Sequence, residues 1–197
     1  MRTVRYRPRW LVAVAAAACL VVGTTALAAA QASPAPNAAP AASAAGTVTL
    51  TDFRGKTMEV PVGADHVVFL VENAMNTFIA VGGGSHISGI GDIWQPSYKE
   101  AFFRATIPGY DELPRVATKD GAVDLESLAA TKPQLVVLWS ADIEDKDTAA
   151  IESGLGVPVY GVFLQSFDDL TKLTRDMAAI AGNPARGEAV IGQIAAE

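Results

Sequence analysis

The stretch Val123–Trp139, VDLESLAATKPQLVVLW, combines a short helix, a stop signal and an apolar strand. In its first half, Leu125, Leu128 and Ala129 recur at helical spacing, which predicts an apolar stripe facing inward. Asp124 precedes this stripe and is one of the residues that commonly cap a helix N-terminus. We therefore expect a short helix that begins after Asp124 and packs through these three side chains.

The second half of the stretch predicts a strand buried on both faces. Pro133 prevents the helix from continuing, and Leu135–Trp139 is apolar at every position. An unbroken apolar strand is typical of a parallel sheet covered by helices on both faces. Glu126 lies beside the apolar stripe, on the exposed side of the helix. Ser140 directly follows the strand, at the edge where open α/β sheets bind ligands.

The composition excludes several classes of function. The 197 residues include 15 basic and 21 acidic side chains, and four of the arginines lie before position 10. A nucleic-acid-binding protein needs clustered Lys and Arg to neutralise phosphates, so we expect no nucleic-acid partner. The single cysteine, Cys19, also lies near the N-terminus. The remainder of the chain therefore has no thiol for a disulfide or a metal site, which suits an oxidising compartment.

The N-terminal part has the features of an export signal. Basic residues precede position 10, Leu11–Val22 is apolar, and Ala30-Gln31-Ala32 fits a cleavage site. An uncleaved membrane anchor is the alternative, since Trp10–Ala30 nearly reaches the length of a bilayer span. We predict four segments: a signal peptide (1–32), an Ala/Pro-rich linker (33–46), a ligand-binding α/β lobe (47–183) and the start of a further helix (184–197).

The globular part reads as a hairpin followed by alternating strands and helices. Thr47–Pro61 alternates around Arg54-Gly55-Lys56 and predicts a β-hairpin. Apolar strands are then expected at His66–Val71, Ile87–Gly91, Leu135–Trp139 and Val157–Phe163, with helices between them. This alternation predicts an α/β fold with a parallel sheet and helices on both faces. Ser166 is expected to cap a long helix that ends at Gly182.

The ends of the predicted strands supply the candidate ligand site. Loops that follow parallel strands share one edge of the sheet, so their polar and aromatic side chains converge there. Such a mixture suits a small-molecule site. The candidates are Glu72, Asn73, Trp94, Trp139, Ser140 and Phe163. No Gly-x-Ser-x-Gly or Walker motif is present, and neither His66 nor His86 has partners at metal-ligand spacing. We therefore predict no catalytic residues, no bound metal and no cofactor.

These patterns, in this order, resemble the substrate-binding proteins of ABC importers for iron–siderophore complexes, haem and cobalamin. The hairpin VTLTDFRGKTMEVP resembles the usual start of that family. Glu72-Asn73 before a helix that ends in Gly82-Gly83-Gly84 is similar to its first βαβ unit. Val123–Val137 resembles the family's helix with a central acid, followed by an apolar strand. Gln134 replaces the aspartate that usually follows this proline.

The resemblance implies an amino-terminal lobe, a long linking helix and a second lobe, with the ligand held between the lobes. It also implies that Glu126 docks on the permease of the importer. The second lobe is expected to be absent from these 197 residues. The expected ligand is an iron–siderophore complex or another metal chelate, with haem and cobalamin left open, and the expected location is the periplasm or cell surface. The alternatives are an exported single-lobe interaction module without a small ligand and, with less support, a hydrolase that uses Ser140.

Overall fold

The structure is a computed structural model that describes residues 46–91, 97–118 and 121–196. Its strands are β1 (Thr47–Thr51), β2 (Thr57–Pro61), β3 (Val67–Phe69), β4 (Ile87–Ile90), β5 (Leu135–Trp139) and β6 (Val159–Val162). Its α-helices are α1 (Glu72–Ala80), α2 (Ser97–Thr106), α3 (Leu125–Ala130), α4 (Lys146–Leu155), α5 (Phe167–Ile180) and α6 (Pro184–Ile194). Short 3-10 helices occupy Gly84–His86 and Tyr110–Glu112. Among the described residues, no helix has both the length and the apolar character needed to cross a bilayer.

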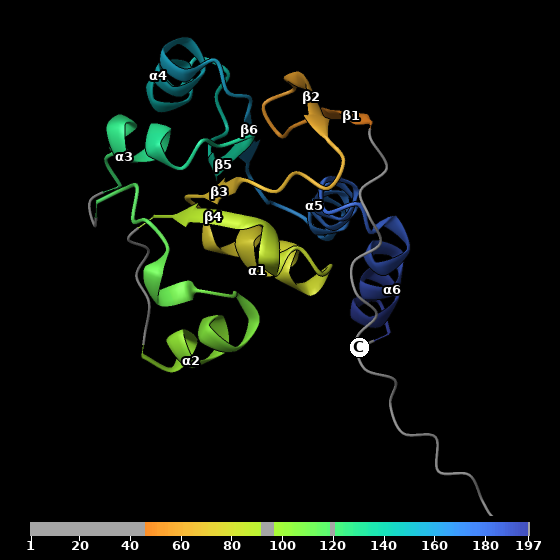
Figure 1. The fold of residues 1–197 in the computed structure, drawn as a ribbon. Coiled ribbons are helices and arrows are strands. Elements are labelled where there is room, and N and C mark those ends of the chain that lie inside the picture. The colour runs from red at the N-terminus through yellow and green to blue at the C-terminus, as the bar shows by residue number, and fades with distance from the viewer. Residues whose placement is uncertain (1–45, 92–96, 119–120, 197) are drawn as a thin grey trace, which may run out of the picture. The chain divides into compact units, whose positions relative to one another are not determined.

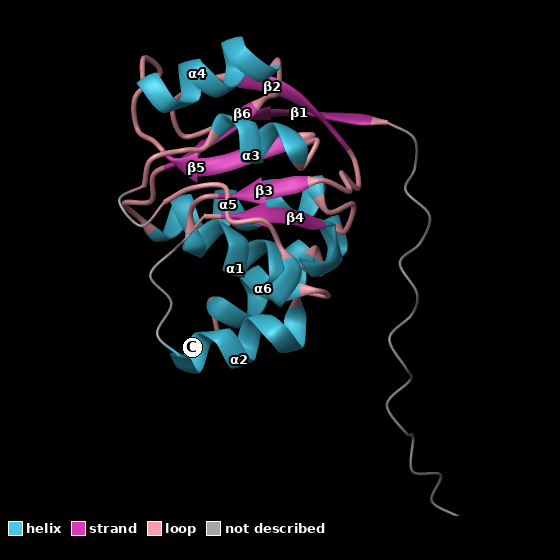
Figure 2. Ribbon diagram, turned by 60° about the vertical axis from the view of Figure 1, so that its left-hand side comes forward, coloured by secondary structure: helices cyan, strands magenta, loops and turns pink. Residues whose placement is uncertain are grey.

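The predicted α/β class is confirmed. Strands β3, β4, β5 and β6 form a parallel sheet in the order β4-β3-β5-β6, and β1 and β2 form a separate antiparallel hairpin. Helices α3 and α4 lie on one side of this sheet, and α1 and α5 lie on the other (Figures 1 and 2). Helix α6 packs against α5, where a Cβ added at Gly187 would lie 2.5 Å from the Cβ of Ala178.

Strand β5 is buried on both faces, as its apolar run predicts. Leu135 and Val137 pack into the core under α1 and α5, whereas Val136 and Leu138 pack into the core under α3 and α4. Because successive side chains of a strand point to opposite faces, one apolar run supplies both cores. The exception is Trp139, the last residue of the strand, which is 60% exposed.

The predicted three-residue stripe on α3 is wrong in two of its members. Leu128 is fully buried, but Leu125 is 37% exposed and Ala129 is also exposed. Helix α3 has only six residues, and Leu128 is the one side chain that it buries. The predicted cap is confirmed, because a carboxylate oxygen of Asp124 accepts hydrogen bonds from the backbone N–H groups of Glu126 and Ser127, both at 3.1 Å.

A buried carboxylate anchors the hairpin to the edge of the parallel sheet. Asp52 is 3% exposed and accepts hydrogen bonds from the backbone N–H groups of Arg54, Lys56 and Gly161, at 2.9, 3.0 and 2.9 Å. Phe53 N–H donates in return to the carbonyl of Gly161 at 3.2 Å. The hairpin turn thus pairs with β6, which would otherwise be an open edge strand.

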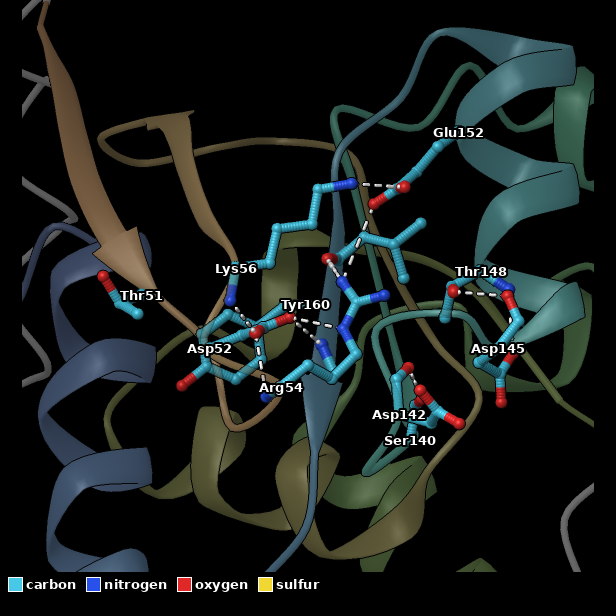
Figure 3. Close-up of polar contacts among 12 residues, drawn as sticks. Thr51, Asp52, Arg54, Lys56, Ser140, Asp142, Asp145, Thr148, Glu152 and Tyr160 are labelled. Carbon is cyan, nitrogen blue, oxygen red and sulfur yellow. Dashed lines mark hydrogen bonds and ion pairs between the residues drawn. The ribbon is translucent and has the colours of Figure 1, made fainter.

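Arg54 completes this anchor from inside the protein. Its Nε donates to Asp52 at 2.7 Å, and its Nη2 donates to the carbonyl of Val159 at 2.6 Å (Figure 3). Glu152 of α4 lies 3.6 Å from the same Nη2 and also accepts from Lys56. The arginine stem passes over Gly161, where an added Cβ would lie 2.6 Å from Nε. A glycine is therefore required in β6 for the hairpin to dock.

Candidate functional site

The strand order places a topological switch point between β3 and β5. These two strands are neighbours in the centre of the sheet, in the register Val67↔Leu135 to Phe69↔Val137. The chain leaves β3 through α1 on one face, whereas it leaves β5 toward α4 on the other face. In open α/β sheets, ligands bind outside the carboxyl ends of the strands at such a point. The loops after β3, β5 and β6 therefore frame the candidate site.

An aromatic pair stands at this edge of the sheet. Trp139 ends β5 and pairs in register with Val162, the last residue of β6. Phe163 follows Val162, so the two aromatic rings are neighbours across the ladder. Their centroids lie 5.6 Å apart with an angle of 71° between the planes, an edge-to-face contact. Phe163 is partly buried, whereas Trp139 is 60% exposed. The tryptophan therefore presents most of its surface to solvent while one side of its ring is packed against Phe163.

The residues after β3 lie at the start of α1. Glu72 is the first residue of this helix and is half-buried, with its carboxylate 3.4 Å from the Nδ2 of Asn76. Asn73 is exposed, and its side-chain oxygen accepts a hydrogen bond from the backbone N–H of Ala74 at 2.7 Å. Both residues therefore lie at the predicted edge, in the helix that follows β3, the strand that neighbours β5.

Ser140 has a structural position in this loop. It is fully buried, its backbone N–H donates to the carbonyl of Val162 at 3.2 Å, and its hydroxyl donates to the carbonyl of Asp142 at 3.1 Å (Figure 3). The hydroxyl is thus used by the protein itself and holds the turn that follows β5. Trp94, the remaining sequence candidate, lies outside the described residues.

Two exposed apolar residues at this edge were not among the sequence candidates. Ile143, in the loop after β5, is 58% exposed, and Phe167, the first residue of α5, is 52% exposed. In the sequence, the acids Asp142, Glu144, Asp145 and Asp147 favour the interpretation of this segment as the solvated face of a helix. Helix α4 begins only at Lys146, so Ile143 belongs to the loop. Phe167 could have been recognised from the sequence, because an apolar residue directly after a capping serine lies in the first turn of a helix, at the edge of the sheet.

The helices that start at this edge are capped by their own carboxylates. Asp145 accepts hydrogen bonds from the N–H groups of Asp147 and Thr148 at 2.9 and 3.0 Å. At α5, Ser166 and Asp169 form a reciprocal capping box. Main-chain and side-chain hydrogen bonds, led by one from the N–H of Gln165, hold the pKa of Asp169 below its usual value.

Glu126 is exposed in the first turn of α3, as predicted. Its helix begins near the carboxyl end of β4, because Asp124 N–H donates to the carbonyl of Val116 and Val116 N–H donates to the carbonyl of Ile90, both at 2.9 Å. The α3 start and the aromatic pair therefore both lie at carboxyl ends of the parallel strands.

The two histidines make local contacts away from any acid cluster. His66 Nδ1 lies 3.2 Å from the carbonyl oxygen of Thr131, and His86 Nδ1 lies 3.1 Å from a carboxylate oxygen of Asp65. Within the described ranges, no group of three or more His, Cys, Asp or Glu side chains is placed to hold a metal ion.

Neither a protein-family model nor a curated protein matches the chain. Solved structures do. A periplasmic solute binding protein from Veillonella parvula matches with a TM-score of 0.63 at 20% identity, over 77% of this chain and 46% of that one. A petrobactin-binding protein from Bacillus subtilis matches at 0.62 and 12% identity, over 77% and 50%. The molybdate periplasmic binding protein from Haemophilus influenzae matches at 0.61 and 16%, over 76% and 51%.

These likenesses establish that the described residues have the fold of a lobe of a periplasmic binding protein. The chain spans about half the length of each of these structures. The ligands named for them differ, since one binds petrobactin and another molybdate. The fold is therefore shared by proteins with different ligands.

Proposed function

We propose that this chain is the ligand-binding lobe of an exported solute-binding protein, which carries a metal chelate to the permease of an ABC importer. The fold supports a binding role, and the carboxyl edge of the sheet supports the position of the ligand. The periplasm or the cell surface is the location that this role implies. An iron–siderophore-like complex is the chelate that the sequence resemblance favours.

The observation that carries the proposal is the exposed Trp139 held against Phe163 at the switch point. A tryptophan that stays 60% exposed keeps a large apolar surface in water. Covering about 100–150 Å² of that surface would contribute about 2.5–4 kcal/mol at 25 cal/mol per Å². The edge-to-face contact fixes the ring before a ligand arrives, so little side-chain entropy is lost on binding.

A fluorescence titration tests this proposal. The chain has three tryptophans, at positions 10, 94 and 139, and a coloured chelate close to Trp139 should quench its emission. Ferrioxamine B, haemin and cyanocobalamin serve as probes. Because one lobe desolvates only one side of a ligand, we expect a dissociation constant weaker than about 1 μM.

Trp139→Ala should weaken binding of the best probe at least tenfold. Phe102→Ala is the matched control, because Phe102 is a similarly exposed aromatic residue, at 48%, on α2. Binding that Trp139→Ala leaves unchanged, or the lack of saturable binding for every probe, would contradict the proposed site.

Glu126 is proposed as the contact to the permease. It is exposed, and its helix starts at the carboxyl edge of the sheet, the edge that carries the aromatic pair. Recovery of a permease from solubilised membranes by the tagged chain should be lost with Glu126→Arg and kept with Glu59→Arg, which reverses an exposed charge on β2. Recovery of another protein that is insensitive to Glu126→Arg would favour the interaction-module hypothesis instead.

We also propose that the chain is not an enzyme. The hydroxyl of Ser140, the residue that a hydrolase mechanism would need, is buried and donates to the carbonyl of Asp142. Turnover of ester or phosphate substrates that is abolished by Ser140→Ala would overturn this statement.

A further inference from the structure

We infer that the aromatic surface, by which we mean the Trp139–Phe163 pair with the exposed Ile143 and Phe167 of the two loops that follow β5 and β6, selects chelates that are cationic or neutral and disfavours anionic ones. This inference rests on the proposed function and adds the charge of the ligand to it.

The two loops that carry this surface are acidic. Residues 139–147 and 163–169 contain six carboxylates and one lysine, Lys146. Asp142, Glu144 and Asp168 are exposed. Asp142 and Glu144 flank Ile143 in the sequence, and Asp168 directly follows Phe167. A ligand on the aromatic surface would therefore approach several negative charges at close range, where opposite charge attracts and like charge repels.

Acidic or capping side chains of the protein occupy the helix starts at this edge. The N-cap of α1, Val71, makes no side-chain hydrogen bond, but the first residue of α1 is itself an acid, Glu72. Helices α4 and α5 both start there, and helix N-termini bind anions through free N–H groups. Here Asp145 accepts from the N–H groups at the start of α4, and Ser166 with Asp169 serves the start of α5. An anionic ligand would have to displace the Asp145 carboxylate at α4, and at α5 it would approach the Asp169 carboxylate, which accepts from Gln165 N–H and Ser166 N–H.

Basic side chains near β6 and β4 are engaged elsewhere. Lys172 donates to the carbonyl of Thr51 at 2.6 Å and pairs with Asp176. The guanidinium of Arg115 lies 4.9 Å from the ring centroid of Tyr110. Arg54 is fully buried in its pair with Asp52. Lys146 is flanked in sequence by two aspartates. Within the two loops themselves, one basic side chain, Lys146, stands beside six carboxylates.

A cationic ligand gains a further interaction from the exposed tryptophan. The face of an indole ring attracts a cation within about 6 Å, and this attraction is strongest for tryptophan among the aromatic residues. The aromatic surface and the surrounding carboxylates thus favour the same type of ligand, an apolar chelate with a neutral or positive charge. Discrimination against an anion comes from repulsion that no favourable contact offsets.

A matched series of chelates tests the inference on the full chain. Ferrioxamine B and its N-acetyl and N-succinyl derivatives share one ferric trihydroxamate core and carry a cationic, a neutral and an anionic tail. Titration at low ionic strength, followed by tryptophan quenching, should give the order cationic, neutral, anionic. We expect the cationic form to bind at least tenfold more tightly than the anionic form, with a ratio that falls in 0.5 M salt.

Removing the charges locates the effect. The double variant Glu144→Gln with Asp168→Asn should lower the cationic-to-anionic ratio at least threefold, and Glu59→Gln, an exposed carboxylate on β2, should leave the ratio unchanged. Equal binding of the three chelates, tighter binding of the anionic one, or an equal effect of Glu59→Gln would overturn the charge preference and leave the proposed function standing. If none of the three chelates and neither haemin nor cyanocobalamin binds, the proposed function falls and this inference falls with it.

Discussion

Replacing Asp52 with asparagine should destabilise the whole lobe, although the side chain keeps its size. The carboxylate receives four N–H donors: Arg54 N at 2.9 Å, Arg54 Nε at 2.7 Å, Lys56 N at 3.0 Å and Gly161 N at 2.9 Å. One oxygen accepts the first and third, so an asparagine oxygen can still serve them. The other oxygen accepts from Arg54 Nε and Gly161 N, where the amide NH₂ of asparagine would face two donors.

The expected cost follows from these two lost bonds and the buried charge. A hydrogen bond to a charged group contributes about 1.5–3 kcal/mol, and removing one partner of a buried ion pair costs about 3–5 kcal/mol. These figures describe the same contacts and are not added, so we expect a loss of about 3–5 kcal/mol in the free energy of unfolding. That is a large part of the roughly 5–15 kcal/mol that stabilises a typical domain.

Urea unfolding followed by circular dichroism measures this loss. With a slope of about 2 kcal/mol per molar urea, the midpoint should fall by about 1.5–2.5 M. Glu59→Gln, on the exposed side of the same hairpin, should change stability by no more than about 0.5 kcal/mol. Asp52→Asn combined with Arg54→Met should cost at least about 2 kcal/mol less than the sum of the single variants, because it removes both charges together. A loss below about 1 kcal/mol for Asp52→Asn, or additive single variants, would refute the assignment of a coupled buried pair.

Three further predictions concern packing, a close approach and pH. Leu128→Ala should cost about 2–5 kcal/mol, since Leu128 is fully buried, whereas Leu125→Ala should cost less than about 1 kcal/mol; thermal unfolding compares the two. Gly161→Ala should lower the free energy of unfolding by about 1–3 kcal/mol in urea, because the added Cβ would lie 2.6 Å from the Arg54 side chain, which a hydrogen bond to Val159 holds in place. A cost near zero would show that the Arg54 side chain can move aside. The pKa of Asp169 is lower in the folded state than in the unfolded state, so the ionised carboxylate stabilises the fold. This stabilisation is fully present above the pKa of the unfolded state and is lost as the pH falls through the pKa of the folded state. Asp169→Asn should therefore be less stable than the parent chain at pH 7, and the difference should shrink below about pH 4; a constant difference would contradict the shift.

Features with a local cause were predictable from the sequence. The cap at Asp124 and the capping box that starts at Ser166 depend on residues two or three positions apart, and both are present. The hairpin at Thr47–Pro61 follows from alternation around a turn and is also confirmed. Strand β5 was recognisable because burial on both faces leaves an unbroken apolar run.

Features with a distant cause were not predictable. Asp52 reads as an ordinary turn residue, and its partner Gly161 lies 109 positions away. Ser140 lies directly after β5, where a ligand is expected, but its side chain is buried and its hydroxyl donates to the carbonyl of Asp142 in its own loop. Leu125 has the spacing of a core residue, yet it is 37% exposed on a helix of six residues that buries only Leu128. In each case the sequence specifies the residue type, and the tertiary neighbours determine its environment.

The hairpin anchor and the aromatic pair are connected through β6. The backbone N–H of Gly161 donates a hydrogen bond to Asp52, and Phe163, two residues further along, supports the ring of Trp139. A parallel strand at the edge of a sheet has one free side, so without the hairpin its end would be among the least constrained parts of the sheet. Anchoring Gly161 restrains that end and keeps the exposed tryptophan on a rigid support. Rigid support of an exposed aromatic residue reduces the entropy lost when a ligand covers it, which is why a buried ion pair that is costly to desolvate is useful at this position.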